Sequence, residues 1–379
     1  MTSPENQVNT SIQIIKLNQH TKGGYVASPL FPPYGYSWLR DGTFIAYSMD
    51  CAGQTESAER FYRWVNQVLS RKRGQVDELI RKHERGQWIE RNEFLNTRYH
   101  LDGRDDSSEW GHFQLDGYGA WLWGLAEHIR KTGKVELLEE FRVSIELTVD
   151  YLRAFWLYPN FDCWEEYPDY VHPATLACIF GGLRAIGQLE GRQELLEAAD
   201  SVRAFLLEHA VHNGHFVKSL QVQDGAWRPV LPGVDASLLW LCVPFQVVPG
   251  DHPAMQATLV RIEAELKHDG IQWYAEDSYY GGGEWLLLTA WYGWVQAELG
   301  NKEEAERCLE WISSKADELG RLPEQVPDSL RHPDAYPEWL QKWGEPANPL
   351  LWSHAMLLVL SNRLAQVYAH PESGNLLKG

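Results

Sequence analysis

The sequence predicts an all-helical protein in which two layers of helices alternate along the chain. Apolar residues recur at the i, i+3, i+4 spacing of an amphipathic helix, as in residues 56–71 and 303–320. Gly133 and Gly191 stand where the end of a helix favours a residue in the left-handed conformation. Outside residues 215–231, no convincing run of residues alternates in the way that strands require. These observations place the chain in the all-α class.

Twelve helical segments are expected, and several neighbours are joined by links short enough for helical hairpins. The segments are 4–19, 41–52, 54–71, 114–132, 134–157, 171–190, 192–212, 235–243, 251–268, 282–299, 302–319 and 349–369. The even-numbered segments are the more apolar, for example over 181–187 and 285–295, whereas their odd-numbered partners carry the charges. Such alternation is typical of buried inner helices covered by amphipathic outer helices.

The long connecting segments precede the even-numbered helices, and the unusual residues of the chain gather in them. These clusters lie at 34–42, 109–117, 163–169, 232–237, 279–285 and 321–326. Long loops on one side of a helical scaffold commonly carry function. If the even-numbered helices form an inner ring, all of these clusters meet at one mouth of that ring.

The composition excludes some classes of partner. Lys and Arg number 34 against 52 Asp and Glu, so the net charge is −18. Nucleic acids and anionic membranes are bound through clustered Lys and Arg, and neither is expected as a partner. The 18 Trp residues favour a neutral partner with hydroxyl groups and apolar faces, such as a small oligosaccharide. An aromatic-rich core would give the same composition.

Cysteine usage and hydropathy predict a cytoplasmic protein. The five cysteines are scattered and form no C-x-x-C pair, so we expect buried thiols rather than a disulfide framework or a zinc site. No signal-peptide pattern begins the chain, and no run of about 18 apolar residues could span a membrane. We expect a single domain over 1–379, with a structured core over about 20–370, that is a monomer or a weak homo-oligomer.

Two segments offer carboxylates for acid–base chemistry. Glu165 and Glu166 directly follow Trp164, whose apolar indole would raise the pKa of a neighbouring carboxylic acid by desolvation. Glu324 stands alone in a loop beside a proline. Cleavage of a glycosidic bond needs such a pair, one carboxyl on each side of the bond. From spacing alone, the simpler interpretation is a helix cap at Glu165 or Glu166 and a solvated Glu324.

Several other residues have a structural and a functional interpretation. Arg40 and Asp41 could form hydrogen bonds to sugar hydroxyls, or Asp41 could cap a helix. Asp116 and Asp235 stand at similar positions, and capping is favoured for Asp235. His354, in an apolar stretch, is expected to be a core histidine. The glycines at 281–283 lack the other residues of a phosphate loop, and no cofactor or metal is predicted.

The segments YGYSWLRDG, FQLDGYG, CWEEYPD, DAS, YYGGGEWLLLTAW, PEQ and WSHA occur in the same order as motifs of a known family. Over residues 34 to 360, nearly the whole chain, they resemble the glucoamylase-type glycoside hydrolases of family 15. The resemblance implies an (α/α)6 barrel, a toroid of six helical hairpins. It also implies an inverting exo-hydrolase that releases β-glucose from the non-reducing ends of α-glucosides.

The resemblance also implies roles for individual residues. Glu165 would be the general acid and Glu324 the general base. The substrate would be bound by Tyr34, Tyr36, Trp38, Arg40, Asp41, Trp110, Trp164, Glu166 and Trp285. Trp273 stands where fungal members carry an Arg, which leaves recognition beyond the first sugar open.

The substrate implied by the resemblance is a short oligosaccharide. The chain shows neither the N-terminal β-sandwich of many bacterial members nor a starch-binding module, and it resembles compact bacterial forms that act on isomaltose-like sugars. We therefore expect α-1,6 linkages to be preferred over α-1,4 linkages. A trehalase of the same family and a catalytically silent sugar-binding barrel remain alternatives.

Overall fold

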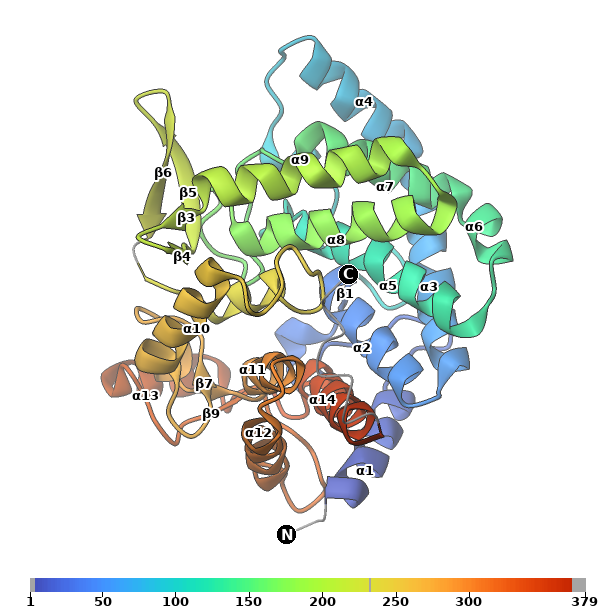
Figure 1. The fold of residues 1–379 in the computed structure, drawn as a ribbon. Helices are drawn as coiled ribbons and strands as arrows, with labels where there is room; N and C mark the ends of the chain where they lie inside the picture. The colour runs from blue at the N-terminus through green and yellow to red at the C-terminus, as the bar shows by residue number, and fades with distance from the viewer. Residues whose placement is uncertain (1–3, 232, 370–379) are drawn as a thin grey trace.

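The computed structural model describes residues 4–231 and 233–369. The predicted domain, 1–379, extends beyond these ranges, and position 232 of the predicted cluster 232–237 lies outside the described residues. Helices make up most of the described chain, as expected (Figure 1). Within those residues, no helix combines the length and the apolar character that crossing a bilayer requires.

Six elements form a closed inner ring in which each packs against the next. In chain order they are α2 (Leu39–Cys51), α5 (Asp116–Thr132), α8 (Pro173–Glu190), the 3-10 helix η4 (Ala236–Leu241), α11 (Leu286–Glu298) and α14 (Leu351–Ala369). The ring closes because α14 packs back against α2. The inner position explains the composition of these elements, since every residue of α11 from Leu286 to Ala297 is buried. The predicted inner role of the even-numbered segments is confirmed.

An outer helix precedes each inner element in the chain. The outer helices are α1 (Pro4–Leu17), α3 (Thr55–Leu69), α7 (Arg142–Phe155), α9 (Gln193–His209), α10 (Pro253–Leu266) and α12 (Lys302–Ser314). Each packs on the ring, as α3 does on α2, α9 on α8 and α12 on α11. In α3, the buried residues Ala58, Phe61 and Val65 recur at helical spacing, whereas Glu59 and Arg63 form a partly buried ion pair. These six pairs build the predicted (α/α)6 barrel.

The element boundaries differ from the predictions at several points. The segment 134–157 is two helices, because α6 (Glu136–Glu140) ends at the buried Phe141 before α7 begins. The predicted helix 235–243 is the short 3-10 helix η4. The predicted helix 282–299 begins only at Leu286, since the residues before it pair as a strand.

Two helices lie in segments that were expected to be loops. α4 (Arg73–Glu84) lies within 72–113, and α13 (Tyr336–Trp343) lies within 320–348. α4 buries only Val76 and Leu79 of its residues, and no residue of α13 is buried. α13 does carry an apolar stripe, formed by Tyr336, Trp339, Leu340 and Trp343, but it spans only eight residues, which is too short for periodicity to identify a helix.

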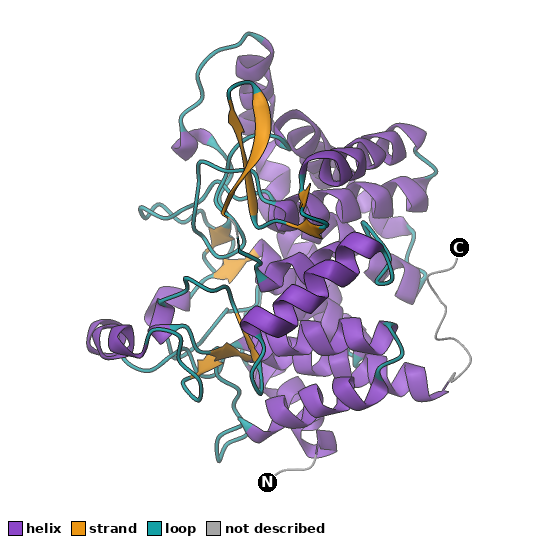
Figure 2. Cartoon of the chain, turned by 60° about the vertical axis from the view of Figure 1, so that its left-hand side comes forward, coloured by secondary structure: helices purple, strands orange, loops and turns teal. Residues whose placement is uncertain are grey.

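Short antiparallel strands accompany the loops. β1 (Ser37–Trp38) pairs with β2 (Arg98–Tyr99), and β8 (Glu284–Trp285) lies between β7 (Ile271–Gln272) and β9 (Gln325–Val326). Two hairpins occupy the predicted strand region: β3 (Val211–His212) with β4 (His215–Phe216), and β5 (Ser219–Gln223) with β6 (Ala226–Leu231). Figure 2 shows that strands and long loops gather on one side of the helical body. The predicted convergence of the loop clusters is confirmed.

Aromatic side chains fill the centre of the ring. The ring of Phe44 stacks on that of Trp352 at 5.6 Å and meets Trp291 edge-on at 4.9 Å. Trp240 lies 5.2 Å from Trp291, and both are fully buried. Several of the tryptophans, Trp240 and Trp291 among them, are thus core residues.

Candidate active site

A cavity of about 410 Å³ opens on the loop side of the barrel. Its volume lies in the range of roughly 300–1,000 Å³ that is typical of sites for small molecules. With the exception of Tyr36, all of the predicted site residues line it. They are Tyr34, Trp38, Arg40, Asp41, Trp110, Trp164, Glu165, Glu166, Trp285 and Glu324.

Tyr36 lies elsewhere. Its ring packs under the guanidinium of Arg98 at 4.1 Å and beside His100 at 5.0 Å. The same guanidinium lies 3.6 Å from the ring of Trp110, which does line the cavity. In the structure Tyr36 thus supports the cavity wall through Arg98, and its contact with the substrate stays a prediction.

Glu165 is presented by a tight loop with an unusual backbone. Its φ is +70°, in the left-handed region that a residue with a side chain seldom occupies. Asp162 holds the loop, because its Oδ1 accepts hydrogen bonds from the backbone N–H of Trp164 at 3.0 Å and of Glu166 at 2.8 Å. The indole of Trp164 donates to Asp235 Oδ1 at 3.1 Å. The surroundings therefore impose a strained conformation that directs Glu165 into the cavity.

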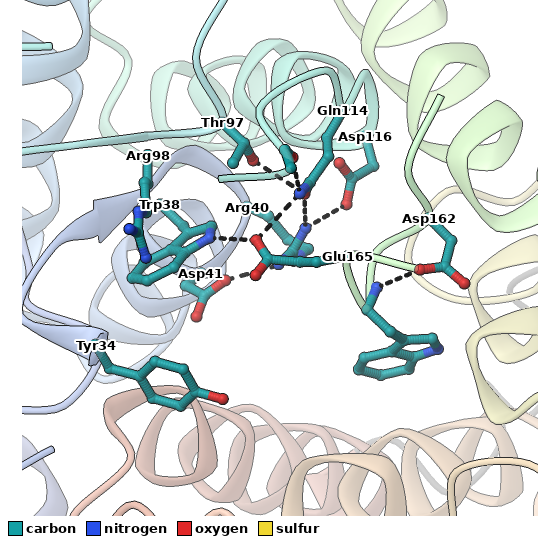
Figure 3. Close-up of polar contacts among 12 residues, drawn as sticks. Tyr34, Trp38, Arg40, Asp41, Thr97, Arg98, Gln114, Asp116, Asp162 and Glu165 are labelled. Carbon is teal, nitrogen blue, oxygen red and sulfur yellow. Dashed lines mark hydrogen bonds and ion pairs between the residues drawn. The ribbon is translucent and has the colours of Figure 1, made fainter. Parts of the chain in front are cut away.

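The carboxyl group of Glu165 accepts hydrogen bonds from the barrel wall (Figure 3). Its Oε1 accepts hydrogen bonds from the indole N–H of Trp38 at 2.7 Å and from the amide N–H of Gln114 at 3.1 Å. Arg40 Nη2 lies 4.0 Å from the same oxygen. The side chain stays 19% exposed. The indole that contacts Glu165 is thus that of Trp38, whereas the sequence suggested Trp164, which turns toward Asp235.

Arg40 and Asp41 form a buried charged pair next to Glu165. Arg40 Nη1 donates to Asp116 Oδ2 and to Gln114 Oε1, both at 2.9 Å, and Arg40 Nε lies 3.4 Å from Asp41 Oδ1. Burial lowers the pKa of Arg40, but Asp116 and Asp41 outweigh it and hold that pKa above its usual value. Burial raises the pKa of Asp41 to about 6, although Arg40 opposes the rise.

The predicted helix caps divide into two groups. Asp235 is the cap of η4, since its Oδ1 accepts the backbone N–H of Ser237 at 2.8 Å, and capping is confirmed. Asp41 and Asp116 are not caps: each lies in the first turn of its helix and pairs with Arg40 instead. A carboxylate in a first turn remains favourable to the helix dipole in either case.

Glu324 is held by contacts between its own segment and α14. Ser353 Oγ donates to the carbonyl of Pro323 at 2.8 Å, and the backbone N–H of Leu322 donates to His354 Nε2 at 3.0 Å. His354 Nδ1 lies 2.9 Å from Ser11 Oγ of α1. Burial lowers the pKa of His354 to about 3, so the ring is neutral. His354 is the core histidine that was predicted, and it also anchors the segment that carries Glu324.

Glu324 has a more enclosed environment than Glu165. It is 3% exposed, and its Oε1 accepts the hydroxyl of Tyr34 at 3.0 Å. The Tyr34 hydroxyl also lies 3.0 Å from that of Tyr279. Burial raises the pKa of Glu324 to about 8, although the tyrosine hydroxyls oppose the rise. Within the described part of the chain, Glu324 Oε2 is buried and has no hydrogen-bond partner.

No pattern in the sequence predicted the charged groups that lie behind Glu166. Tyr274 donates to Glu166 Oε2 at 2.7 Å, and Lys218 Nζ lies 3.1 Å above the ring of Tyr274 and 3.0 Å from Asp235 Oδ2. Asp277 lines the cavity, and burial raises its pKa to about 7. A lone lysine in the link between the two hairpins has no motif or periodicity that could have revealed it.

Further lining residues stand at positions that were not predicted to bind the substrate. Trp273 lines the cavity, as do Trp339, Lys342 and Trp343 of α13. As for metals, no three His, Cys, Asp or Glu side chains are grouped to hold an ion in the residues that the structure covers. The chemistry of the cavity is that of carboxyl groups, a guanidinium and indole rings.

Comparison with known proteins identifies the family. The sequence model of the glycosyl hydrolases family 15 matches residues 5–325. This chain belongs to glycosyl hydrolases family 15. An isomaltose glucohydrolase of Kribbella flavida is 41% identical over 359 residues, which cover 93% of this chain and 90% of that protein.

Solved structures agree with this family 15 assignment. A glycosidase variant in complex with glucose superposes with a TM-score of 0.89 at 40% identity, covering 96% of this chain and 99% of its own. A glucoamylase from Saccharomycopsis fibuligera shares the fold, with a TM-score of 0.72 at 16% identity over 97% of this chain and 95% of its own. The family 15 chain is a glycoside hydrolase, and the predicted class, an inverting exo-glucosidase that releases glucose, is confirmed.

Proposed function

We propose that this family 15 enzyme hydrolyses isomaltose and short isomalto-oligosaccharides at their non-reducing ends. The observation that carries the proposal is that Glu165 and Glu324 line one cavity together with the buried pair of Arg40 and Asp41. The 41% identity to an isomaltose glucohydrolase, over most of both chains, supports α-1,6 linkages as the preferred bonds.

The terminal glucose binds at the end of the cavity formed by the start of α2. Arg40 is held by Asp116 and Gln114, so its guanidinium is already oriented before a sugar arrives. Asp41 accepts hydrogen bonds from the hydroxyls of the sugar, and Arg40 donates hydrogen bonds to them. The aromatic core around Phe44 and Trp352 closes the barrel beyond this point, which suits removal of single terminal sugars.

Glu165 acts as the general acid. Its Oε1 is engaged by Trp38 and Gln114, so Oε2 carries the proton to the glycosidic oxygen. The bond between that oxygen and the anomeric carbon breaks as the proton arrives, and the second sugar leaves as a neutral alcohol.

Glu324 acts as the general base. Its unpartnered Oε2 takes a proton from a water molecule whose oxygen bonds to the anomeric carbon on the face opposite the leaving sugar. The product is therefore β-glucose from an α-linked substrate. Because the pKa of Glu324 is about 8 in the empty cavity, the ionised form that this step needs increases as the pH rises toward that value.

A panel of glucobioses tests this proposal. We expect purified enzyme to release glucose faster from isomaltose than from α-1,2, α-1,3 or α-1,4 glucobioses or from trehalose. NMR spectra recorded before mutarotation should show the β-anomer first. Release of the α-anomer first would contradict inversion, and trehalose as the best substrate would replace the proposed specificity with that of a trehalase.

A further inference from the structure

One wall of the cavity belongs to α13, which lies outside the two helical layers of the barrel. The helix is inserted between β9 and α14 and packs against two short 3-10 turns, η5 (Tyr279–Gly281) and η6 (Pro333–Ala335). Figure 1 shows it to one side of the barrel, near β7 and β9. None of its residues is buried. The helix is therefore an addition to the rim of the cavity that the closure of the barrel does not require.

One face of α13 points into the cavity. Trp339, Lys342 and Trp343 line it, and their i, i+3, i+4 spacing places them on the same side of the helix. Trp339 anchors this face, because its ring packs edge-on against Tyr279 at 4.9 Å and lies 5.8 Å from the ring of Tyr280. Tyr279 in turn lies within the hydrogen-bonded group around Glu324, so α13 is tied to the reactive end of the cavity.

Trp343 differs from the other tryptophans of the cavity. Trp38, Trp110, Trp164 and Trp285 each pack against another aromatic ring and are thereby held in place. Trp343 is 45% exposed, and its ring lies 5.4 Å from the ammonium of Lys342. A large apolar side chain that lines a cavity while remaining exposed is typical of a binding surface.

We propose that Trp343 and Lys342 bind the sugar that follows the terminal glucose. The inference rests on the proposed function, in which the terminal glucose lies near Arg40 and the rest of the substrate extends toward the mouth. The C–H face of the second pyranose packs on the indole of Trp343, and Lys342 donates hydrogen bonds to its hydroxyls.

A contact with the second sugar is especially useful when the linkage is α-1,6. This linkage contains one more rotatable bond than a linkage between two ring carbons, so the second sugar loses more conformational freedom on binding. A platform that holds the second sugar also holds the glycosidic oxygen within reach of Glu165. Trp343 and Lys342 therefore act on oligosaccharides and not on glucosides whose leaving group is too small to reach α13.

The Trp343→Ala variant tests this inference with isomaltose, isomaltotriose and α-glucosyl fluoride as substrates. We expect the KM for both oligosaccharides to rise about tenfold, as is usual for the loss of one good apolar contact. kcat/KM for α-glucosyl fluoride should stay unchanged, because fluoride does not reach α13. Trp343→Phe should restore most of the affinity, and Lys342→Met should raise the KM by about threefold.

Trp88→Ala is the matched control. Trp88 is 80% exposed and is not among the residues that line the cavity, so the same substitution there should leave all three substrates unaffected. An unchanged KM for isomaltose in Trp343→Ala would overturn the inference, and so would an equal loss with α-glucosyl fluoride. If the unmodified enzyme hydrolysed none of the three substrates, the proposed function itself would fail, and the two failures are thus distinguishable.

Discussion

The two carboxyl groups of the cavity lie in contrasting parts of the molecule. Glu165 belongs to a surface loop with left-handed backbone, is partly exposed and accepts hydrogen bonds from Trp38 and Gln114. Glu324 belongs to a segment anchored on α14, is almost fully buried and accepts a hydrogen bond from Tyr34. One group is oriented by a strained loop and N–H donors, and the other by the barrel wall and a hydroxyl.

This contrast shows how one residue type can serve two purposes. Enzymes that use two carboxyls commonly give them different environments, so that one holds a proton while the other accepts one. In the empty cavity, however, burial raises the pKa of the proposed base, Glu324, to about 8. Burial alone thus does not assign the roles, and position relative to the bond and the water molecule must decide between them.

The largest expected effect comes from removing either carboxyl. Glu165→Gln and Glu324→Gln should each lower kcat for isomaltose by about a thousandfold or more, since each removes one proton-transfer step. The leaving group of α-glucosyl fluoride needs little protonation. With this substrate, Glu165→Gln should therefore regain most of the kcat that it loses with isomaltose, whereas Glu324→Gln should not. Initial rates of glucose release measure both effects.

The opposite result with the fluoride would exchange the roles of general acid and general base between Glu165 and Glu324. Recovery of Glu324→Gln with the fluoride, and not of Glu165→Gln, would make Glu324 the acid, in line with its raised pKa. Glu166→Gln is a suitable control, because Glu166 adjoins Glu165 but its Oε2 is engaged by Tyr274. It should affect the KM more than kcat and respond alike to both substrates.

The sequence predicted the barrel better than it predicted the details of the cavity. Helical periodicity and the apolar inner segments identified the ring, because burial on all sides leaves a clear composition, as in α11. The helices α4 and α13 were missed, since α4 buries only Val76 and Leu79, and α13 buries none of its residues and spans only eight positions. Roles for Glu165 and Glu324 came from the resemblance to a family, because spacing alone allowed a helix cap and a solvated loop residue.

The details of the cavity that the sequence did not predict depend on contacts between segments that are distant in the chain. Trp164 precedes Glu165 in the chain, but the indole that reaches Glu165 comes from Trp38, 127 positions away. Tyr36 and Tyr34 stand two positions apart, and yet only Tyr34 lines the cavity. Such differences depend on tertiary packing, which a single sequence does not display.

Loosening the loop that carries Glu165 is expected to lower kcat for isomaltose by about a hundredfold. Asp162→Ala removes the acceptor for the N–H groups of Trp164 and Glu166, so the loop no longer holds Glu165 in its strained conformation. Glu165 would then be misplaced by distances that cost catalysis heavily. Asp162→Asn keeps an oxygen acceptor and should retain more activity. Equal activity in the two variants, measured as kcat for isomaltose, would show that the loop does not depend on this acceptor.

The smallest expected effect is a change in the pH dependence of kcat/KM, which arises in the region around Glu324. Tyr34→Phe removes the hydroxyl that donates to Glu324, and because this hydrogen bond lowers the pKa of Glu324, its loss raises that pKa beyond about 8. A base with a raised pKa loses its ionised form earlier as the pH falls. kcat/KM for isomaltose should therefore drop roughly tenfold at pH 7 and much less at pH 9, with the acidic limb moved to higher pH. Tyr36→Phe, the same change outside the cavity, should leave the profile unmoved. A loss of equal size at every pH would mean that Tyr34 positions the substrate and does not tune Glu324.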